Sequence, residues 1–220
     1  GLFTEQIGKM VKSVPLVLKQ WNKISPLICF LADDANCTMK QIQRMLRRYP
    51  QLLQYSIENK LKPKMLFLCT ELDIDNSSDD FAKIIASFPT ILWLTEPTIM
   101  AKIDFLRSEL RLDTNNYELE EIVLAMPSIL GLSLKNNLKP KFEFFTQSVG
   151  MTRWELKEFV LYQPALLAYS LENRIKPRVA HMETKGISFK YCPPYLMSLT
   201  DDKFASWCDT QTSTWSIIET

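Results

Sequence analysis

The chain has 220 residues, of which 46% are hydrophobic and 23% charged, and its formal net charge is +1. This composition is typical of a soluble globular domain, and the near-neutral charge gives no global electrostatic basis for binding nucleic acid. No apolar run approaches the roughly 18 residues that a membrane span needs. The five cysteines include no CxxC pair and His181 is the single histidine, so we expect reduced thiols and no metal site.

Two prolines recur through the chain at nearly constant intervals. The leading prolines are spaced by 35, 39, 38 and 37 residues and are Pro15, Pro50, Pro89, Pro127 and Pro164. The trailing prolines, with Ala101 in place of the missing one, are Pro26, Pro63, Pro140 and Pro177. A period near 37 residues predicts a stack of similar structural units.

A helix is predicted before each leading proline, because apolar residues recur there at i, i+3, i+4 and i+7. The clearest sets are Ile7, Met10, Val11, Val14, then Ile42, Met45, Leu46, Tyr49, then Phe81, Ile84, Ile85, Phe88, then Leu119, Ile122, Val123, Met126, and finally Leu156, Phe159, Val160. Capping boxes are predicted at Thr38–Gln41, Ser77–Asp80, Asn115–Glu118 and Thr152–Glu155. The leading proline then ends each helix.

A short apolar turn and a second helix are predicted after each leading proline. An apolar pair, such as Leu52 and Leu53, precedes a capping hydroxyl at Ser56, Thr95, Ser133 or Ser170. The trailing proline falls in the first turn of the second helix, where proline is tolerated best. Gly150 and Gly186 stand where a glycine would close that helix.

These patterns predict an all-α helical-repeat solenoid in a single domain, residues 1–208. The expected units are roughly 4–37, 38–76, 77–114, 115–151 and 152–187, followed by a partial repeat over 188–208 that shields the last apolar face. Residues 209–220 are predicted to form a polar, mobile tail.

Basic residues cluster around the leading and trailing prolines, whereas the linkers after the second helix are acidic. Stacking equivalent positions predicts a basic stripe that could hold a phosphate backbone. The candidate nucleic-acid-binding residues are Arg44, Arg47, Arg48, Lys60, Lys62, Lys64, Lys102, Lys139, Lys141, Arg174, Lys176 and Arg178. The alternative is that these are ordinary solvated side chains at helix ends, and the helical phase of the recurring aromatics favours packing over base stacking.

No catalytic motif is visible: the sequence has no glycine-rich phosphate loop and no GxSxG, and its single histidine has no nucleophile in register. We therefore expect neither an enzyme nor a cofactor. A monomer without membrane attachment is expected. Because the sequence begins at Gly1 rather than Met, it leaves open whether a targeting segment preceded it.

The repeat resembles the mTERF motif of the mitochondrial transcription termination factor family. The resemblance rests on the leading proline with its apolar pair, the cap serine, and the LKPK-type start of the second helix, as in Pro50–Leu53, Ser56 and Leu61–Lys64, over roughly residues 7–204. It implies a half-ring of units with two α-helices and a 3₁₀ turn each, in a mitochondrion or chloroplast.

The resemblance also implies binding of double-stranded DNA or RNA along a basic groove, in transcription termination or regulation, or in rRNA or intron processing. Two other functions remain open: a docking scaffold that recruits a partner enzyme in organellar ribosome assembly, and a divergent member with no nucleic-acid role. Neither the choice between DNA and RNA nor the target sequence follows from these residues.

Overall fold

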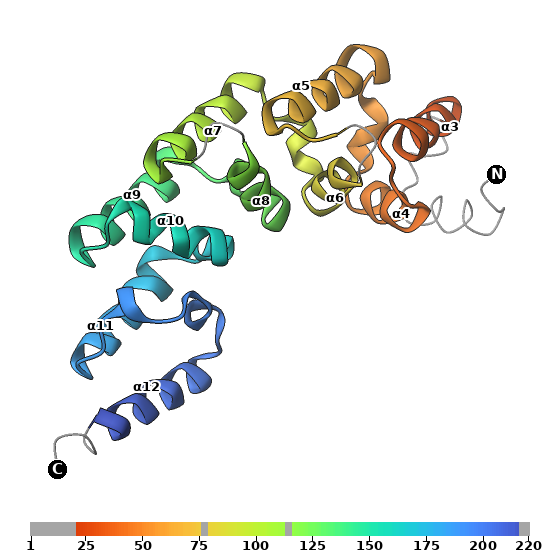
Figure 1. The fold of residues 1–220 in the computed structure, drawn as a ribbon. Coiled ribbons are helices and arrows are strands. Elements are labelled where there is room, and N and C mark those ends of the chain that lie inside the picture. The colour runs from red at the N-terminus through yellow and green to blue at the C-terminus, as the bar shows by residue number, and fades with distance from the viewer. Residues whose placement is uncertain (1–20, 76–78, 113–115, 216–220) are drawn as a thin grey trace. The chain divides into compact units, whose positions relative to one another are not determined.

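The structure is a computed structural model that describes residues 21–75, 79–112 and 116–215, and within these ranges it contains helices and no strand (Figure 1). The predicted all-α class is thus confirmed. The backbone divides into two compact units, residues 1–99 and 100–220, and the division falls inside helix α7. None of the described helices has the combination of length and hydropathy that crossing a bilayer needs.

The first unit contains helix–turn–helix repeats of the predicted kind. Its elements are α3 (Trp21–Cys29), the π-helical η1 (Phe30–Asp34), α4 (Met39–Arg48), the 3₁₀-helix η2 (Pro50–Gln54), the π-helical η3 (Ile57–Leu61), α5 (Lys62–Leu72), α6 (Asp80–Ser87), the 3₁₀-helix η4 (Pro89–Trp93) and the start of α7 (Glu96–Leu110). The predicted first helix of the first repeat, with Ile7, Met10, Val11 and Val14, lies outside the described residues.

The second unit continues the same order. It contains α8 (Tyr117–Ala125), the 3₁₀-helix η5 (Pro127–Gly131), the π-helical η6 (Leu134–Leu138), α9 (Lys139–Glu143), the π-helical η7 (Phe144–Ser148), α10 (Arg153–Tyr162), the 3₁₀-helix η8 (Pro164–Ala168), the π-helical η9 (Leu171–Ile175) and α11 (Lys176–Thr184). The 3₁₀-helices η10 (Phe189–Tyr191) and η11 (Pro194–Ser198) then lead to α12 (Asp201–Trp215), which extends into the segment expected to be a polar tail.

Local hydrogen bonds fix where the helices begin. The capping boxes at Thr38–Gln41 and Thr152–Glu155 are both formed, as predicted. In the second box the Thr152 N–H donates to Glu155 Oε2 at 2.7 Å, and the Glu155 N–H donates to Thr152 Oγ1 at 3.2 Å. The predicted cap residues Ser77 and Asn115 lie outside the described residues.

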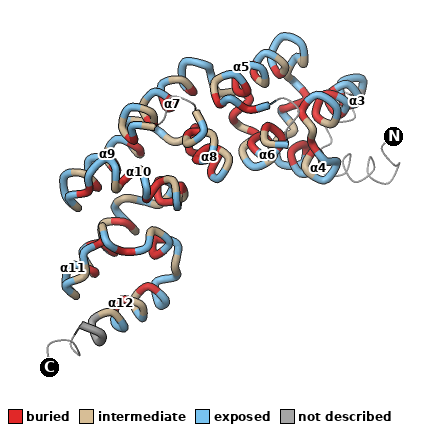
Figure 2. The backbone as a smooth tube through the Cα atoms, in the orientation of Figure 1, coloured by how far each residue is buried: buried red, intermediate tan, exposed pale blue. Residues whose placement is uncertain are grey.

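Most of the apolar positions that the period predicted lie in the core, whereas Tyr49 and Phe88 at the ends of their helices are half-buried. In Figure 2 the buried positions lie on the sides of the helices that face their neighbours. Ile42, Met45 and Leu46 of α4 are buried, as are the apolar pairs of the 3₁₀-helices: Leu52 and Leu53, Ile91 and Leu92, Ile129 and Leu130, Leu166 and Leu167. First helices stack side by side, α4 on α6 in one unit and α8 on α10 in the other.

Three second helices begin with a π-helical turn that the sequence analysis did not predict. Ser56 accepts a hydrogen bond from the Asn59 N–H, and its carbonyl accepts one from the Leu61 N–H, five residues on. Ser133 and Ser170 repeat both contacts. A π turn is a one-residue insertion into an α-helix. Accordingly, Pro63 lies seven positions after Ser56, whereas Ala101 lies six positions after Thr95 in α7, which has no π turn.

We expect Thr152→Ala to lower the free energy of unfolding by about 1 kcal/mol, because it removes the side-chain cap of α10 and leaves the Glu155 N–H without its acceptor. Urea denaturation followed by circular dichroism measures this change. The matched control is Thr184→Ala at the end of α11, whose hydroxyl bonds only to the His181 carbonyl of its own helix. A Thr152→Ala effect no larger than that of the control would contradict the assigned cap.

Candidate nucleic-acid interface

The twelve basic residues that the sequence selected fall into three groups by burial. The exposed group is Arg44, Arg47, Arg48, Lys60 and Lys139. The half-buried group is Lys62, Arg174 and Lys176. The buried group is Lys64, Lys102, Lys141 and Arg178. The sequence pattern therefore did not distinguish the cations that solvent reaches from those that are buried.

Helix α4 carries the most concentrated exposed positive charge. Lys40, Arg44, Arg47 and Arg48 are all exposed and occupy i, i+4, i+7 and i+8, on the side away from the buried apolar residues. The helix contains no acidic residue. Within the described ranges, none of these four side chains forms an ion pair. We call these four residues the α4 basic face.

The cations at the start of the second helices more often contact an aromatic ring or a carboxylate. The ammonium group of Lys60 lies 5.7 Å from the ring centroid of Tyr55, and Lys62 pairs with Glu58 at 2.8 Å. Lys176 pairs with Glu172 at 2.6 Å. Exposed pairs of this kind contribute little to stability, so their cations remain able to exchange partners.

Arg174 is held more firmly than the exposed pairs. Its guanidinium donates to the Leu199 carbonyl at 2.6 Å and lies 4.7 Å from the ring centroid of Tyr169. These contacts fix the side chain against the neighbouring 3₁₀ segment.

The α4 basic face has no equivalent on the other described first helices. On α6, Lys83 pairs with Asp80 at 2.7 Å. Helix α8 carries three acids, Glu118, Glu120 and Glu121, and no basic residue. Exposed positive charge on the first helices is therefore concentrated on α4, whereas the later candidate cations lie beside the trailing prolines at the start of the second helices.

The four buried cations share one position in the repeat, directly after the trailing proline or, for Lys102, after Ala101. Their exposed fractions are 5% for Lys64 and Lys102, 1% for Lys141 and 4% for Arg178. In the first repeat the same position is Leu27, which is buried as well. This position therefore faces the core in the first repeat as well as in the later ones, and a cation there needs polar partners inside the protein.

Lys141 shows how such a cation is satisfied. Its ammonium group donates to the Leu167 carbonyl at 2.5 Å and to Asn137 Oδ1 at 2.5 Å. Leu167 lies in η8, the 3₁₀-helix of the following repeat, so the bond joins two repeats. Loss of hydration on burial lowers the pKa of Lys141 to about 8, because no carboxylate offsets the cost of the buried charge.

Arg178 makes the same connection with more bonds. Its guanidinium donates to the carbonyls of Leu196 at 2.9 Å, Met197 at 3.2 Å and Leu199 at 2.8 Å. It also pairs at 2.6 Å with Asp201, the first residue of α12, and this contact lowers the pKa of that carboxyl group. Arg178 therefore attaches η11 and α12 to the preceding repeat.

Lys64 reaches the equivalent acid in the first unit, since it pairs at 3.6 Å with Glu96, the first residue of α7. Burial lowers the pKa values of Lys64 and Lys102. A phosphate group cannot reach the four buried cations without opening the core, and we assign Lys64, Lys141 and Arg178 to contacts between repeats. The candidate interface in the first unit thus consists of the α4 basic face together with Lys60, and Lys139 is a separate exposed cation of the second unit.

Potential metal ligands are dispersed over the part of the chain that the structure describes. No three His, Cys, Asp or Glu side chains there gather at a separation that could hold a metal ion. Cys37, Cys69, Cys192 and Cys208 are buried, Cys29 is exposed, and all five are free thiols. Burial raises the pKa of Cys192 to about 11, which keeps that thiol protonated and unreactive near neutral pH.

We expect the stability of the wild-type protein to rise relative to that of Lys141→Met between pH 8 and about 10.5. Lys141 has a pKa near 8 when folded and about 10.5 when unfolded, so the unfolded state binds more protons in this window. Below pH 8, the difference in free energy of unfolding between the two proteins should not vary with pH. Between pH 8 and about 10.5, that difference should shift by about 3 kcal/mol in favour of the wild-type protein. Urea denaturation of both proteins across this range measures it, and parallel pH profiles would contradict the buried ammonium.

We expect Arg178→Met to lower the free energy of unfolding by about 3 kcal/mol, because it removes the hydrogen bonds to Leu196, Met197 and Leu199 and leaves the Met197 carbonyl without its donor. The matched control is Lys176→Met, two residues earlier, where only a half-exposed pair with Glu172 is lost and the change should stay within about 0.5 kcal/mol. Equal effects of the two substitutions would show that Arg178 does not join the repeats.

Comparison with known proteins supports the repeat assignment. The mTERF family profile matches residues 4–205, nearly the whole chain. A search of curated proteins found no significant match. The family match covers the paired helices, the 3₁₀ turns and the buried cations described above. The chain belongs to the mTERF family.

Proposed function

We propose that this protein binds nucleic acid through its exposed cations and acts, without catalysing a reaction, in gene expression in a mitochondrion or chloroplast. Family membership supports the general function. The observation that carries the proposal for this chain is the α4 basic face, with four exposed cations and no acid on the same helix.

The spacing of the α4 basic face suits a phosphate backbone. Lys40, Arg44 and Arg48 stand about one helical turn apart, roughly 5.4 Å along the axis, so several cations can contact phosphate groups at once. Lys and Arg in such positions release condensed counterions when they bind, which gives sequence-independent affinity. Arg47 and Arg48 also lie in the last turn of α4, where the helix dipole favours positive charge.

The competing proposal is a scaffold that docks a partner enzyme in organellar ribosome assembly. A neutral docking face would bind with weak salt dependence, because few counterions are released. Salt dependence therefore separates the two proposals. The same measurement applies to DNA targets such as transcription sites and to RNA targets such as structured rRNA or introns.

We expect the full chain to bind labelled duplex DNA or structured RNA with an affinity that falls steeply as salt increases. Replacing Arg44, Arg47 and Arg48 together by Gln should weaken binding and reduce the slope of log affinity against log salt by about 2 to 3 on duplex DNA, near 0.9 per lost phosphate contact. Fluorescence anisotropy across a salt series measures both quantities and shows which nucleic acid is preferred.

The matched control is Lys83→Gln on α6, an exposed cation already paired with Asp80, and it should leave the slope unchanged. Absence of binding to either nucleic acid at low salt would overturn the proposal. So would a slope that the triple substitution leaves unaltered.

A further inference from the structure

The last repeat has lost most of its first helix. Its leading proline is Pro194, only 30 residues after Pro164, whereas the earlier intervals are 35 to 39. In the preceding repeat, α10 occupies residues 153–162 between the cap Thr152 and Pro164. In the last repeat, the three-residue η10 fills this place, and Ser188 before it makes no side-chain cap.

The rest of the last repeat is intact. Gly186 has a φ of 71°, matching 73° at Gly150 before the preceding first helix. Pro194 begins η11, whose apolar pair Leu196 and Met197 is fully buried. The second helix, α12, follows in its usual place. The deletion is thus confined to about two turns of the first helix.

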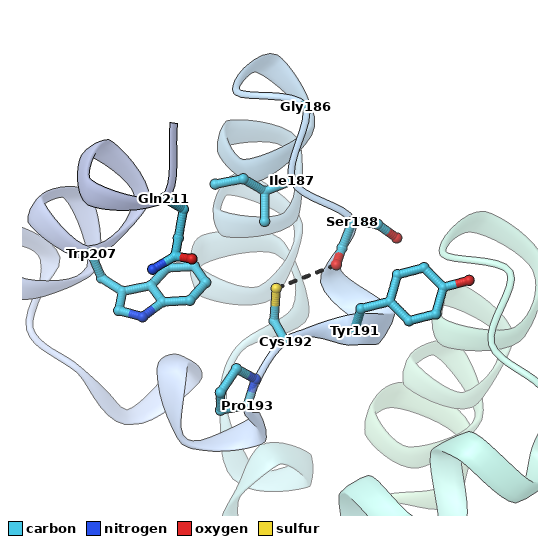
Figure 3. A pocket seen from close by; sticks show the side chains of 8 residues that line it. All are labelled: Gly186, Ile187, Ser188, Tyr191, Cys192, Pro193, Trp207 and Gln211. Carbon is cyan, nitrogen blue, oxygen red and sulfur yellow. Dashed lines mark hydrogen bonds between the residues drawn. The ribbon is translucent and has the colours of Figure 1, made fainter. Parts of the chain in front are cut away.

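A pocket of about 490 Å³ lies beside this shortened segment (Figure 3). Trp207 and Gln211 of α12 line one side, and Ile187 and Cys192 line the other. Gly186, Ser188, Tyr191 and Pro193 complete the lining.

We propose that this pocket binds an amphipathic helix of a partner protein, which takes the place of the missing first helix. In the second unit, α8 and α10 lie side by side as first helices, so this layer is built from helices with apolar residues at i, i+3, i+4 and i+7. An incoming helix with that pattern would continue the layer past η10, as in other helix-in-groove complexes.

The chemistry of the lining favours this occupant over a phosphate. No charged side chain lines the pocket, so it offers nothing to neutralise a nucleic-acid backbone. A second copy is also disfavoured, because the apolar faces of the described first helices α4, α6, α8 and α10 are already buried in their own stack. The inference is therefore independent of the proposed nucleic-acid function.

Large aromatic side chains are exposed in the same two repeats. The exposed fraction is 75% for Tyr191, 68% for Trp154 and 67% for Tyr162. Tyrosine and tryptophan are enriched at protein interfaces because they bury a large rigid surface and retain a polar group. Tyr191 itself lines the pocket.

The test uses the full chain and a labelled peptide of residues 115–126, a first-helix sequence with apolar residues Leu119, Ile122, Val123 and Met126. We expect a dissociation constant of about 10 to 100 μM by fluorescence anisotropy. Gln211→Glu and Trp207→Glu should each weaken binding at least about tenfold, since they place an unpaired charge in the pocket. The matched control is Lys203→Glu, an exposed position of α12 outside the lining.

A second variant fills the pocket in cis. Residues 188–193 are replaced by the sequence of residues 152–163, which restores a full first helix. We expect this chain to have a higher Tm and at least tenfold weaker peptide binding. No binding by the wild-type chain up to about 1 mM peptide would overturn the proposal. Undiminished peptide binding by the filled variant would also overturn it. So would dimerisation of the wild-type chain that the filled variant abolishes, because the occupant would then be a second copy.

Discussion

The structure depends on a buried cation in one repeat that donates to backbone carbonyls in the next. A 3₁₀ turn of five residues leaves carbonyl groups unpaired at its end, and burying them without donors would be costly. Lysine and arginine each carry several donors on a long flexible stem. Lys141 donates to a carbonyl of η8, and Arg178 donates to carbonyls of η11. The second helix of one repeat thus supplies donors to the 3₁₀ turn of the next repeat.

This arrangement divides the basic residues between two tasks. The cation after the trailing proline is fixed inside the protein, and its burial lowers the pKa where no carboxylate compensates, as at Lys141. The cations on α4 remain in solvent and face no acid on their own helix. A near-neutral chain can therefore present a strongly basic surface locally, because the acidic residues lie on other elements, notably α8.

The sequence predicted those features that follow from short-range periodicity. The buried face of α4, the caps at Thr38 and Thr152, and the hydroxyl at Ser56 depend on spacing within one helix or turn. It did not predict the burial of Lys141, because a lone charge is normally exposed and only the following repeat supplies its acceptors. The available signal was that the residue after the trailing proline is basic in four copies and apolar at Leu27. The π turns had a signal too, because the trailing proline lies seven positions after the cap serine, one more than the distance from Thr95 to Ala101.

Hydrogen exchange of Lys141→Met, resolved by segment, tests most directly whether buried cations couple the repeats. In a repeat protein, stability is roughly a sum of intrinsic terms and neighbour contacts, so weakening one contact should uncouple the repeats on either side. We predict that residues 164–184 lose protection at a lower free energy than residues 117–131, whereas in the wild-type protein both segments open together. Equal loss of protection in both segments, or none in either, would contradict the coupling role.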